Sequence, residues 1–187
     1  MELSIARIYY PVKTLGPGNR IGIWTAGCPR RCSGCISPEL QHAEAGREMT
    51  AEEILRLLAA ITDPVDGITI SGGEPFARPE PLSRLMRALA KRWEDILIFT
   101  GYTYEQLLAQ NSAEVKTVLS LCAVLIDGPY IAQRNDGVGL RGSSNQRIHV
   151  FRNLEKYAGL AHAPRQLQNI LFDDKIVTIG IPRGADK

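Results

Sequence analysis

The stretch that most constrains this chain spans residues 28–35 and reads Cys-Pro-Arg-Arg-Cys-Ser-Gly-Cys. It holds three of the four cysteines of the sequence in a C-x3-C-x2-C array. Three closely spaced thiolates can hold three corners of a cubic iron–sulfur cluster and leave the fourth iron without a protein ligand. Because such an iron can bind a further molecule, we expect Cys28, Cys32 and Cys35 to carry a [4Fe-4S] cluster with an open coordination site.

A zinc site is the main alternative for the same cysteines. Structural zinc takes four ligands, usually as two separated pairs, and His42 does not complete a familiar zinc spacing with the array. Cys122 lies within an apolar run, where we expect a small buried hydrophobic residue. A fourth cysteine ligand would also close the open iron, so the array favours a cluster over zinc.

Composition argues against several other classes of protein. With 187 residues, 44% hydrophobic and 22% charged, the chain is long enough for one domain with a core and short for two. A net charge of +2 and a pI near 8.4 argue against nucleic acid or an acidic membrane surface as a partner. No signal-peptide pattern or membrane span is evident, so the four cysteines indicate metal binding or catalysis, and we expect the cytoplasm.

Apolar periodicity predicts alternating strands and helices. Thr50 and Glu53 form a capping box, and apolar residues at helical spacing predict a helix over residues 50–62. Further helices are predicted after Pro79 and after Thr103. Strands are predicted at residues 3–12, 20–26, 67–70, 96–99 and 123–126, and the chain ends in a predicted β-hairpin of residues 167–172 and 175–181.

This alternation indicates parallel strands joined by right-handed crossovers. The expected fold is α/β, an open, partial β/α barrel of about five or six mainly parallel strands with a C-terminal β-hairpin, because a closed eightfold barrel needs about 250 residues. Ligands of such folds bind at the carboxyl ends of the strands. Four segments are expected to meet there: residues 28–35, 71–75 and 100–102, and Asp127.

Residues 71–75, Ser-Gly-Gly-Glu-Pro, form the second candidate site segment. A Gly-Gly turn after a strand is common and by itself indicates little. Gly72 and Gly73 would nevertheless let a ligand approach the backbone closely, and Glu74 offers a carboxylate to a ligand ammonium group. The turn gains meaning from its combination with the cysteine array.

The array and the turn together resemble the radical S-adenosylmethionine superfamily. Further motifs, in the expected order, resemble one subgroup, the activating proteins of anaerobic ribonucleoside-triphosphate reductase. Ser33 favours this subgroup, because many other members of the superfamily carry an aromatic residue at that position. The resemblance covers residues 5–151, and its motifs are residues 9–12, 16–18, 27–28, 32–35, 71–73, 100–102, 124–128 and 141–146, with His149.

The resemblance implies two cofactors, a [4Fe-4S] cluster and S-adenosylmethionine, and no side chain acting as acid, base or nucleophile. The implied cluster ligands are Cys28, Cys32 and Cys35. The implied S-adenosylmethionine site comprises Ser33, Gly34 and Cys35 in the cluster loop, Gly72, Gly73 and Glu74 at the methionine amino group, and Thr100, Asp127 and His149 near the ribose or carboxylate. For Thr100, Asp127 and His149 the alternative is a purely structural role in a turn, a loop cap and a strand.

The activity implied by the resemblance is reductive cleavage of S-adenosylmethionine at the cluster. The 5′-deoxyadenosyl radical then takes a hydrogen atom from a glycine Cα of a partner, the large subunit of anaerobic ribonucleoside-triphosphate reductase, and leaves a glycyl radical there. A one-electron donor such as flavodoxin or ferredoxin reduces the cluster. Two alternatives stay open: a radical enzyme acting on another peptide or small molecule, and a non-catalytic iron–sulfur protein that transfers electrons.

Two domain segments are predicted. Residues 1–151 form the activase-like domain, and residues 152–187 form a C-terminal extension packed on it, which the shortest activases lack. Arg30, Arg31, Arg141 and Arg147 are each expected to be solvated surface charges, with a basic rim for the partner or the electron donor as the alternative.

Overall fold

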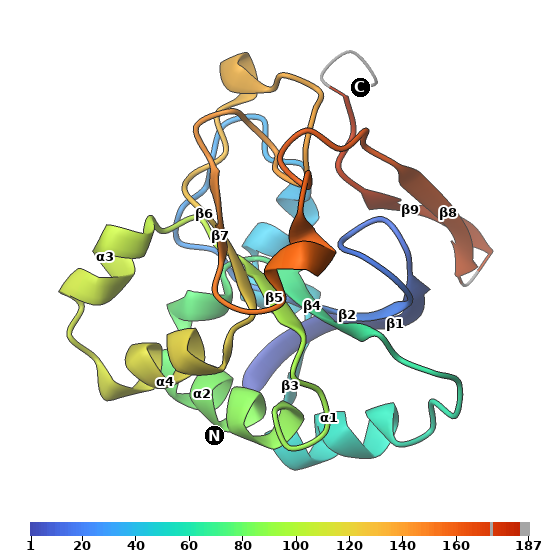
Figure 1. Ribbon diagram of the computed structural model, residues 1–187. Helices are drawn as coiled ribbons and strands as arrows, with labels where there is room; N and C mark the ends of the chain where they lie inside the picture. The colour runs from blue at the N-terminus through green and yellow to red at the C-terminus, as the bar shows by residue number, and fades with distance from the viewer. Residues whose placement is uncertain (173, 184–187) are drawn as a thin grey trace.

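A computed structural model describes residues 1–172 and 174–183 of the chain (Figure 1). The strands in these residues are β1 (Leu3–Val12), β2 (Arg20–Thr25), β3 (Arg47–Met49), β4 (Gly67–Gly72), β5 (Ile96–Phe99), β6 (Val124–Asp127), β7 (Arg147–Val150), β8 (Leu167–Phe172) and β9 (Lys175–Gly180). The α-helices are α1 (Ala51–Leu58), α2 (Pro79–Leu89), α3 (Tyr104–Ala109) and α4 (Ala113–Leu121). The short 3-10 helices are η1 (Pro38–Gln41), η2 (Ala43–Ala45), η3 (Pro75–Ala77), η4 (Ala132–Arg134) and η5 (Leu154–Tyr157).

The main sheet has the strand order β3-β1-β2-β4-β5-β6-β7 in the described part of the chain. Its four inner strands β2, β4, β5 and β6 run parallel, whereas β1, β3 and β7 join antiparallel at the two edges. The expectation of mainly parallel strands therefore holds for the inner strands, but the sheet has seven strands instead of five or six. Periodicity does not indicate β3, because three residues are too few to show a period.

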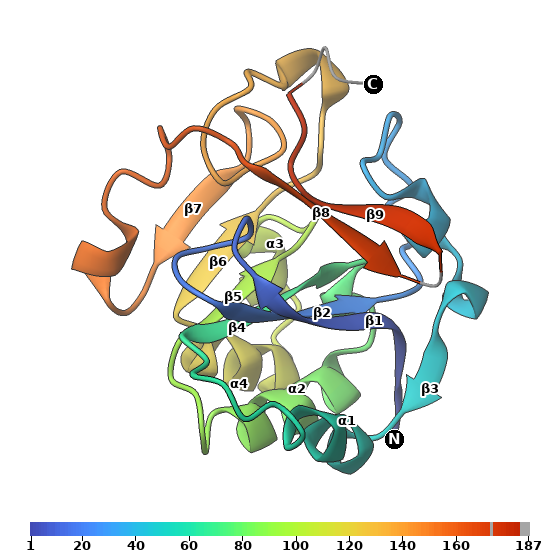
Figure 2. The same cartoon turned by 90° about the vertical axis from the view of Figure 1, so that its right-hand side faces the viewer.

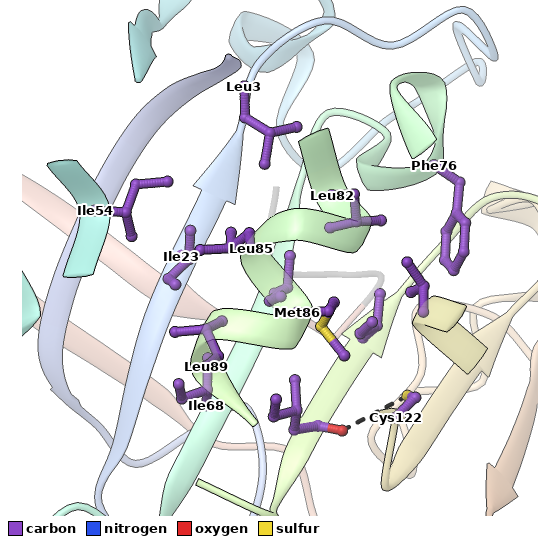
Figure 3. Packing of buried hydrophobic residues seen from close by; sticks show 14 of the residues in the cluster. Leu3, Ile23, Ile54, Ile68, Phe76, Leu82, Leu85, Met86, Leu89 and Cys122 are labelled. Carbon is purple, nitrogen blue, oxygen red and sulfur yellow. Dashed lines mark hydrogen bonds between the residues drawn. The ribbon is translucent and has the colours of Figure 1, made fainter. Parts of the chain in front are cut away.

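Helices α1, α2 and α4 cover one face of this sheet (Figures 1 and 2). The apolar stripe of α2, predicted from its spacing, is fully buried against Ile23 of β2 and Ile68 of β4 (Figure 3). Each such side chain contributes about 1.5–3 kcal/mol by leaving water, so this face holds the main core. The stripe comprises Leu82, Leu85, Met86 and Leu89.

Cys122 belongs to this core (Figure 3). Its side chain is fully buried, and its S–H donates to the carbonyl oxygens of Val124 at 2.9 Å and Ile96 at 3.6 Å. Burial raises the pKa of this thiol to about 12. The prediction of a small buried hydrophobic residue is confirmed.

The C-terminal hairpin β8–β9 lies across the opposite face of the sheet, above β1 and β2 in Figure 2. Ile170 and Ile179 are buried there in a second core cluster that includes Trp24 of β2. The side chain of Gln168 fixes the hairpin to β1, since its Nε2 donates to Pro11 O at 2.8 Å and its Oε1 accepts from Lys13 N at 3.0 Å. The predicted hairpin is confirmed.

Arg20, at the start of β2, ties the C-terminal segment to the amino ends of the strands. Its fully buried guanidinium donates to Asp95 Oδ1 at 3.0 Å and to Tyr157 Oη at 3.2 Å. Tyr157 and Lys156 of η5 also donate hydrogen bonds to the Asp95 carboxylate. One carboxylate thus joins three parts of the chain that are far apart in sequence.

Local capping signals fix the helix starts. The capping boxes at Thr50 and Thr103 are both formed. Helix α1 ends at Leu58 instead of residue 62, because Ala60 and Ile61 donate to carbonyls only three residues back and so tighten the last turn. Within the described residues no helix is long and apolar enough to cross a membrane.

Candidate cofactor site

A cavity of about 650 Å³ opens at the carboxyl ends of the parallel strands. It brings together three of the four segments expected at this rim, the cysteine loop, the Gly-Gly-Glu turn and the end of β5. The predicted site residues that line it are Cys28, Cys32, Cys35, Gly72, Gly73, Glu74 and Thr100. A second cavity of about 660 Å³ lies at the amino ends of β4 and β5, and none of these residues lines it.

The cysteine loop is held by the backbone of η1. Gly27, which has a φ of +88°, turns the chain out of β2 and donates its N–H to Leu40 O at 2.9 Å. Cys28 N donates to Gln41 O at 3.0 Å, and Cys35 N donates to Cys32 O at 3.2 Å. The buried parallel strand β2 and the turn η1 thus support the loop from both sides.

The three cysteines are suited to a common ligand larger than one ion. All three are free, partly exposed and border the same cavity. Among residues 1–172 and 174–183, no group of three or more His, Cys, Asp or Glu side chains is arranged to hold a metal ion. The donor set of three thiols around one cavity therefore fits a [4Fe-4S] cluster with one iron left open.

Burial raises the pKa of the Cys28 thiol, and hydrogen bonds from the backbone of Arg30 and Arg31 partly oppose that effect. A thiol must lose its proton to bind a metal. Cluster binding at Cys28 therefore has to overcome this preference for the neutral form.

The Gly-Gly-Glu turn packs directly on the cysteine loop. Gly73 N donates to Thr25 O at 2.7 Å, and Glu74 N donates to Gly27 O at 2.9 Å. A Cβ atom on Gly73 would lie 2.3 Å from Gly27 O and 2.9 Å from Leu40 O, which are backbone atoms that cannot easily move away. Only glycine at position 73 therefore lets the turn and the loop approach this closely.

The carboxylate of Glu74 is buried and held by three donors. Oε1 accepts from Thr100 Oγ1 at 2.8 Å and from Phe76 N at 3.0 Å, and Oε2 accepts from Gly101 N at 2.7 Å. Burial raises the pKa of Glu74, and these hydrogen bonds only partly offset the shift. The carboxylate has a fixed orientation at the cavity wall, and its lone pairs can accept further hydrogen bonds from a cationic ligand.

Arg30 lies at the same cavity and packs over the ring of Tyr102, with its Cζ 5.1 Å from the ring centroid. Its side chain also borders Gly101. Arg30 is therefore more than a solvated surface charge, because it places a cation between the cysteine loop and the end of β5. The expectation for this arginine is corrected.

Asp127 and His149 lie outside the lining of this cavity. The Asp127 carboxylate is fully buried and accepts from Tyr104 N at 2.6 Å and from Arg147, while His149 Nε2 lies 3.2 Å from Asp127 Oδ2. Burial raises the pKa of Asp127, but hydrogen bonds from Arg147 and Tyr104, together with the nearby His149, outweigh it and hold the pKa below its usual 3.8. The structure joins the two residues to each other and to α3, and their cofactor role stays a prediction.

Arg147 also pairs with Glu105 of α3, donating to its carboxylate at 2.6 Å and 2.8 Å. This bond lowers the pKa of Glu105 to about 2. Arg147 is exposed, as expected of a surface charge, and it also bridges two carboxylates from two elements.

Arg141 and Arg31 complete the set of predicted surface arginines. Arg141 is mostly buried and donates to Asp136 Oδ2 at 2.8 Å, so its expected solvation is corrected as well. Arg31 is exposed, as expected.

Ser33 and Gly34 are exposed in the cysteine loop and do not belong to the cavity lining. Their predicted contact with an adenine stays a prediction.

Several residues of the lining were not predicted. Gln146 donates to Gly128 O at 2.7 Å and accepts from Gly142 N at 2.7 Å, so it shapes the loop that follows β6. The run of residues 141–146, already selected as a motif, contained that signal.

The hairpin also contributes to the lining, through Leu167 of β8 and residues 176–182. Sequence reasoning placed the hairpin at the end of the fold and gave it a part in the site only in the alternative of another peptide or small-molecule substrate. No local feature distinguishes a strand that borders a cavity from one that only extends a sheet.

Comparison with known proteins adds three findings. Residues 14–149 match the family described as a 4Fe-4S single cluster domain. Over 153 residues, 77% of this chain and 97% of the relative, the sequence is 33% identical to the anaerobic ribonucleoside-triphosphate reductase-activating protein of Salmonella typhi. Over 101 residues, 50% of this chain and 42% of the relative, it is 36% identical to the pyruvate formate-lyase-activating enzyme of Clostridium pasteurianum.

Among solved structures, the chain is similar to QueE from Escherichia coli, with a TM-score of 0.48 and 20% identity over 55% of this chain and 54% of that one. This likeness is too small to inform the fold or the site.

Proposed function

This chain belongs to the family of anaerobic ribonucleoside-triphosphate reductase-activating proteins, and on that premise we propose that it generates a glycyl radical on such a reductase. One observation carries the proposal. The three cysteines and the Gly-Gly-Glu turn line one cavity, and Glu74 N donates to the carbonyl oxygen of Gly27, the residue before Cys28. A cluster site and a site for a cationic amino acid moiety thus lie side by side.

The two cofactors are a [4Fe-4S] cluster, held by Cys28, Cys32 and Cys35, and S-adenosylmethionine. Bound together, they supply a reductive cleavage that yields a 5′-deoxyadenosyl radical, which can take a hydrogen atom from a glycine Cα. The chain's own residues bind and orient, because the turn Gly72–Glu74 and the carboxylate of Glu74 accept the methionine amino group. Thr100 positions that carboxylate through its hydrogen bond.

We propose the remaining S-adenosylmethionine contacts from the neighbours of residues that line the cavity. Ser33 and Gly34 adjoin the cluster ligands Cys32 and Cys35 in sequence, which places them within reach of an adenine bound near the cluster. Asp127 directly precedes Gly128, which lines the cavity, and His149 contacts Asp127. We therefore assign Asp127 and His149 a role at the ribose that acts through the position of Gly128.

We also propose the surroundings of the reaction. The partner is the large subunit of the reductase, a flavodoxin or ferredoxin supplies the electron, and the cytoplasm is the compartment, which three free cysteines around one site support. Nucleic acid and membranes are not partners in this proposal.

We also propose a more detailed description of the fold. We propose that the parallel strands form part of an open β/α barrel in residues 1–151 and that residues 152–187 are an extension of it. The family match ends at residue 149, which supports a boundary near residue 151. The hydrogen bond from Tyr157 to Asp95 supports packing of the extension on the domain. An experimental structure that showed a flat sheet, or an extension detached from the domain, would contradict it.

The test of the activity uses anaerobically reconstituted protein with dithionite and S-adenosylmethionine. We expect 5′-deoxyadenosine and, with added reductase, an EPR doublet from the glycyl radical. Cys32→Ala should lose both the iron and the product, whereas Cys122→Ala, the matched control in the core, should keep both. Absence of 5′-deoxyadenosine from the wild-type protein would reduce the chain to a non-catalytic iron–sulfur protein. Product without a glycyl radical would indicate another substrate.

A further inference from the structure

The hairpin β8–β9 lies beyond the residues that match the family, which end at position 149. Its two strands pair only with each other in the described part of the chain. One face packs on the second core cluster, where Ile170 is 8% and Ile179 is 2% exposed. The hairpin is therefore firmly seated. Ile179 O on the outer edge of β9 accepts from Thr14 Oγ1 at 3.1 Å, and neither outer edge pairs with a further strand of the described residues.

The other face of the hairpin is open to solvent, with apolar side chains at its two ends and the hydrogen-bonded pair Asn169 and Thr178 between them. Leu171 and Ile176 are directly opposite each other across the two strands, and they are 73% and 75% exposed. Leu167, two pairs farther along the same face, is 46% exposed. Adjacent large apolar side chains with this exposure mark an interaction surface more often than isolated ones do. We call Leu167, Leu171 and Ile176 the hairpin face.

The hairpin face continues into the cofactor cavity. Leu167 and Ile176 line the cavity together with Cys28, Cys32 and Cys35, while Leu171 lies just outside its lining. A polypeptide segment that extends from the cavity over Ile176 would reach Leu171, which lies directly opposite on the neighbouring strand.

We propose that the hairpin face and the adjoining strand edge dock an extended, apolar stretch of the partner polypeptide next to the residue that enters the cavity. This rests on the proposed function, because it takes the substrate to be a polypeptide. An extended segment can add to a free strand edge through its backbone and bury apolar side chains on the neighbouring face. The family-matched residues would then make the radical, and the hairpin would select the polypeptide that receives it.

The test compares Leu171→Asp with the wild type at several reductase concentrations. Leu171 is exposed and lies outside the cavity, so the variant should fold and should cleave S-adenosylmethionine without reductase at the wild-type rate. The concentration of reductase that gives half of the maximal glycyl-radical signal should rise about tenfold or more. The reason is that the substitution places a charge at a position that the bound reductase would cover. Leu171→Met should keep the wild-type value, and Leu57→Asp, at a residue that is 54% exposed on α1 on the helix-covered side, should not change it.

The outcomes separate the two proposals. Loss of 5′-deoxyadenosine formation in the wild type contradicts the proposed function itself. Suppose instead that every variant cleaves S-adenosylmethionine normally and that Leu171→Asp needs no more reductase than the wild type for half of the maximal signal. That result overturns the docking proposal alone. If gel filtration shows a wild-type dimer that Leu171→Asp dissociates, while reductase activation stays normal, the hairpin face binds a second copy of this chain and the docking proposal is equally overturned.

Discussion

Thr100 Oγ1 donates a hydrogen bond of 2.8 Å to Glu74 Oε1 and thereby joins the end of β5 to the turn that follows β4. Thr100 N in turn donates to Ile126 O of β6 at 2.9 Å. The rim of the cavity is thus connected across three neighbouring parallel strands. Its central element is a buried carboxylate that has no other charged group bonded to it among the described residues.

Glu74→Gln should destabilise the protein without its cofactors by about 1–3 kcal/mol. Three donors converge on the carboxylate, and a glutamine amide replaces one acceptor oxygen by an NH₂ group that faces a donor. Urea unfolding of the iron-free protein measures the loss. Thr100→Ser, which keeps the hydroxyl, is the control and should cost less than half as much. Equal stability of Glu74→Gln and the wild type would show that the hydrogen bonds are not formed in solution.

Gly73→Ala should disrupt the contact between the Gly-Gly-Glu turn and the cysteine loop. The new methyl group would meet two backbone carbonyl oxygens, so the loop must shift and iron incorporation should fall severalfold. Gly101→Ala is the control, because its methyl group would approach side-chain atoms only, Arg30 Cγ at 3.2 Å and Glu74 Oε2 at 3.3 Å. Iron content after reconstitution is the measurement. A full complement of iron in Gly73→Ala would mean that the cysteine loop does not depend on this turn.

Acid should destabilise the fold through the ion pairs around Arg147. The folded-state pKa of Asp127 lies below its usual 3.8, and that of Glu105 falls to about 2 from 4.5. Folding therefore favours the ionised forms, and this stabilisation is present above the ordinary pKa values and lost as the pH falls through the lowered ones. Unfolding free energies measured between about pH 5 and about pH 2 should fall.

The variant Asp127→Asn tests the origin of this pH dependence. It should be less stable than the wild type at neutral pH and should lose less stability on acidification. Glu80→Gln, which removes an exposed ion pair with Arg84, should keep the wild-type slope. If Asp127→Asn followed the wild-type curve at every pH, the carboxylate would not be the titrating group.

Asp95→Asn should destabilise the protein by about 3 kcal/mol or more. The substitution leaves Arg20, which is fully buried, without its counter-charge and weakens the bond to Tyr157 from the C-terminal segment. Glu48→Gln breaks a pair with Arg78 that is half exposed on both sides and should cost at most about 1 kcal/mol. Urea denaturation compares the two. Similar losses in both variants would show that the Asp95 network contributes no more than a surface pair.

Local signals in the sequence predicted much of the fold. The capping boxes at Thr50 and Thr103, the α2 stripe, the inner strands and the C-terminal hairpin all depend on residues close in the chain. The strand β3 and the antiparallel edges were missed, because edge pairing depends on which distant strand lies alongside.

The site divides in the same manner. The cysteine array and the Gly-Gly-Glu turn were recognisable because spacing alone carries their chemistry. The separation of Asp127 and His149 from the cavity was not recognisable in the sequence. Neighbouring strand residues point to opposite sides, so Asp127 faces α3 while Gly128 borders the cavity.

The sequence by itself indicated the chemistry of this protein, because the spacing of three cysteines within eight residues is typical of a cluster loop. It also determined the alternation of strands and helices that carries the cysteine loop. Only the tertiary structure decided that Glu74 is held by Thr100 and Gly101, that Arg147 bridges two carboxylates, and that the hairpin borders the cysteines. These contacts join residues far apart in the chain, so their geometry exists only once the sheet has brought the strand ends together.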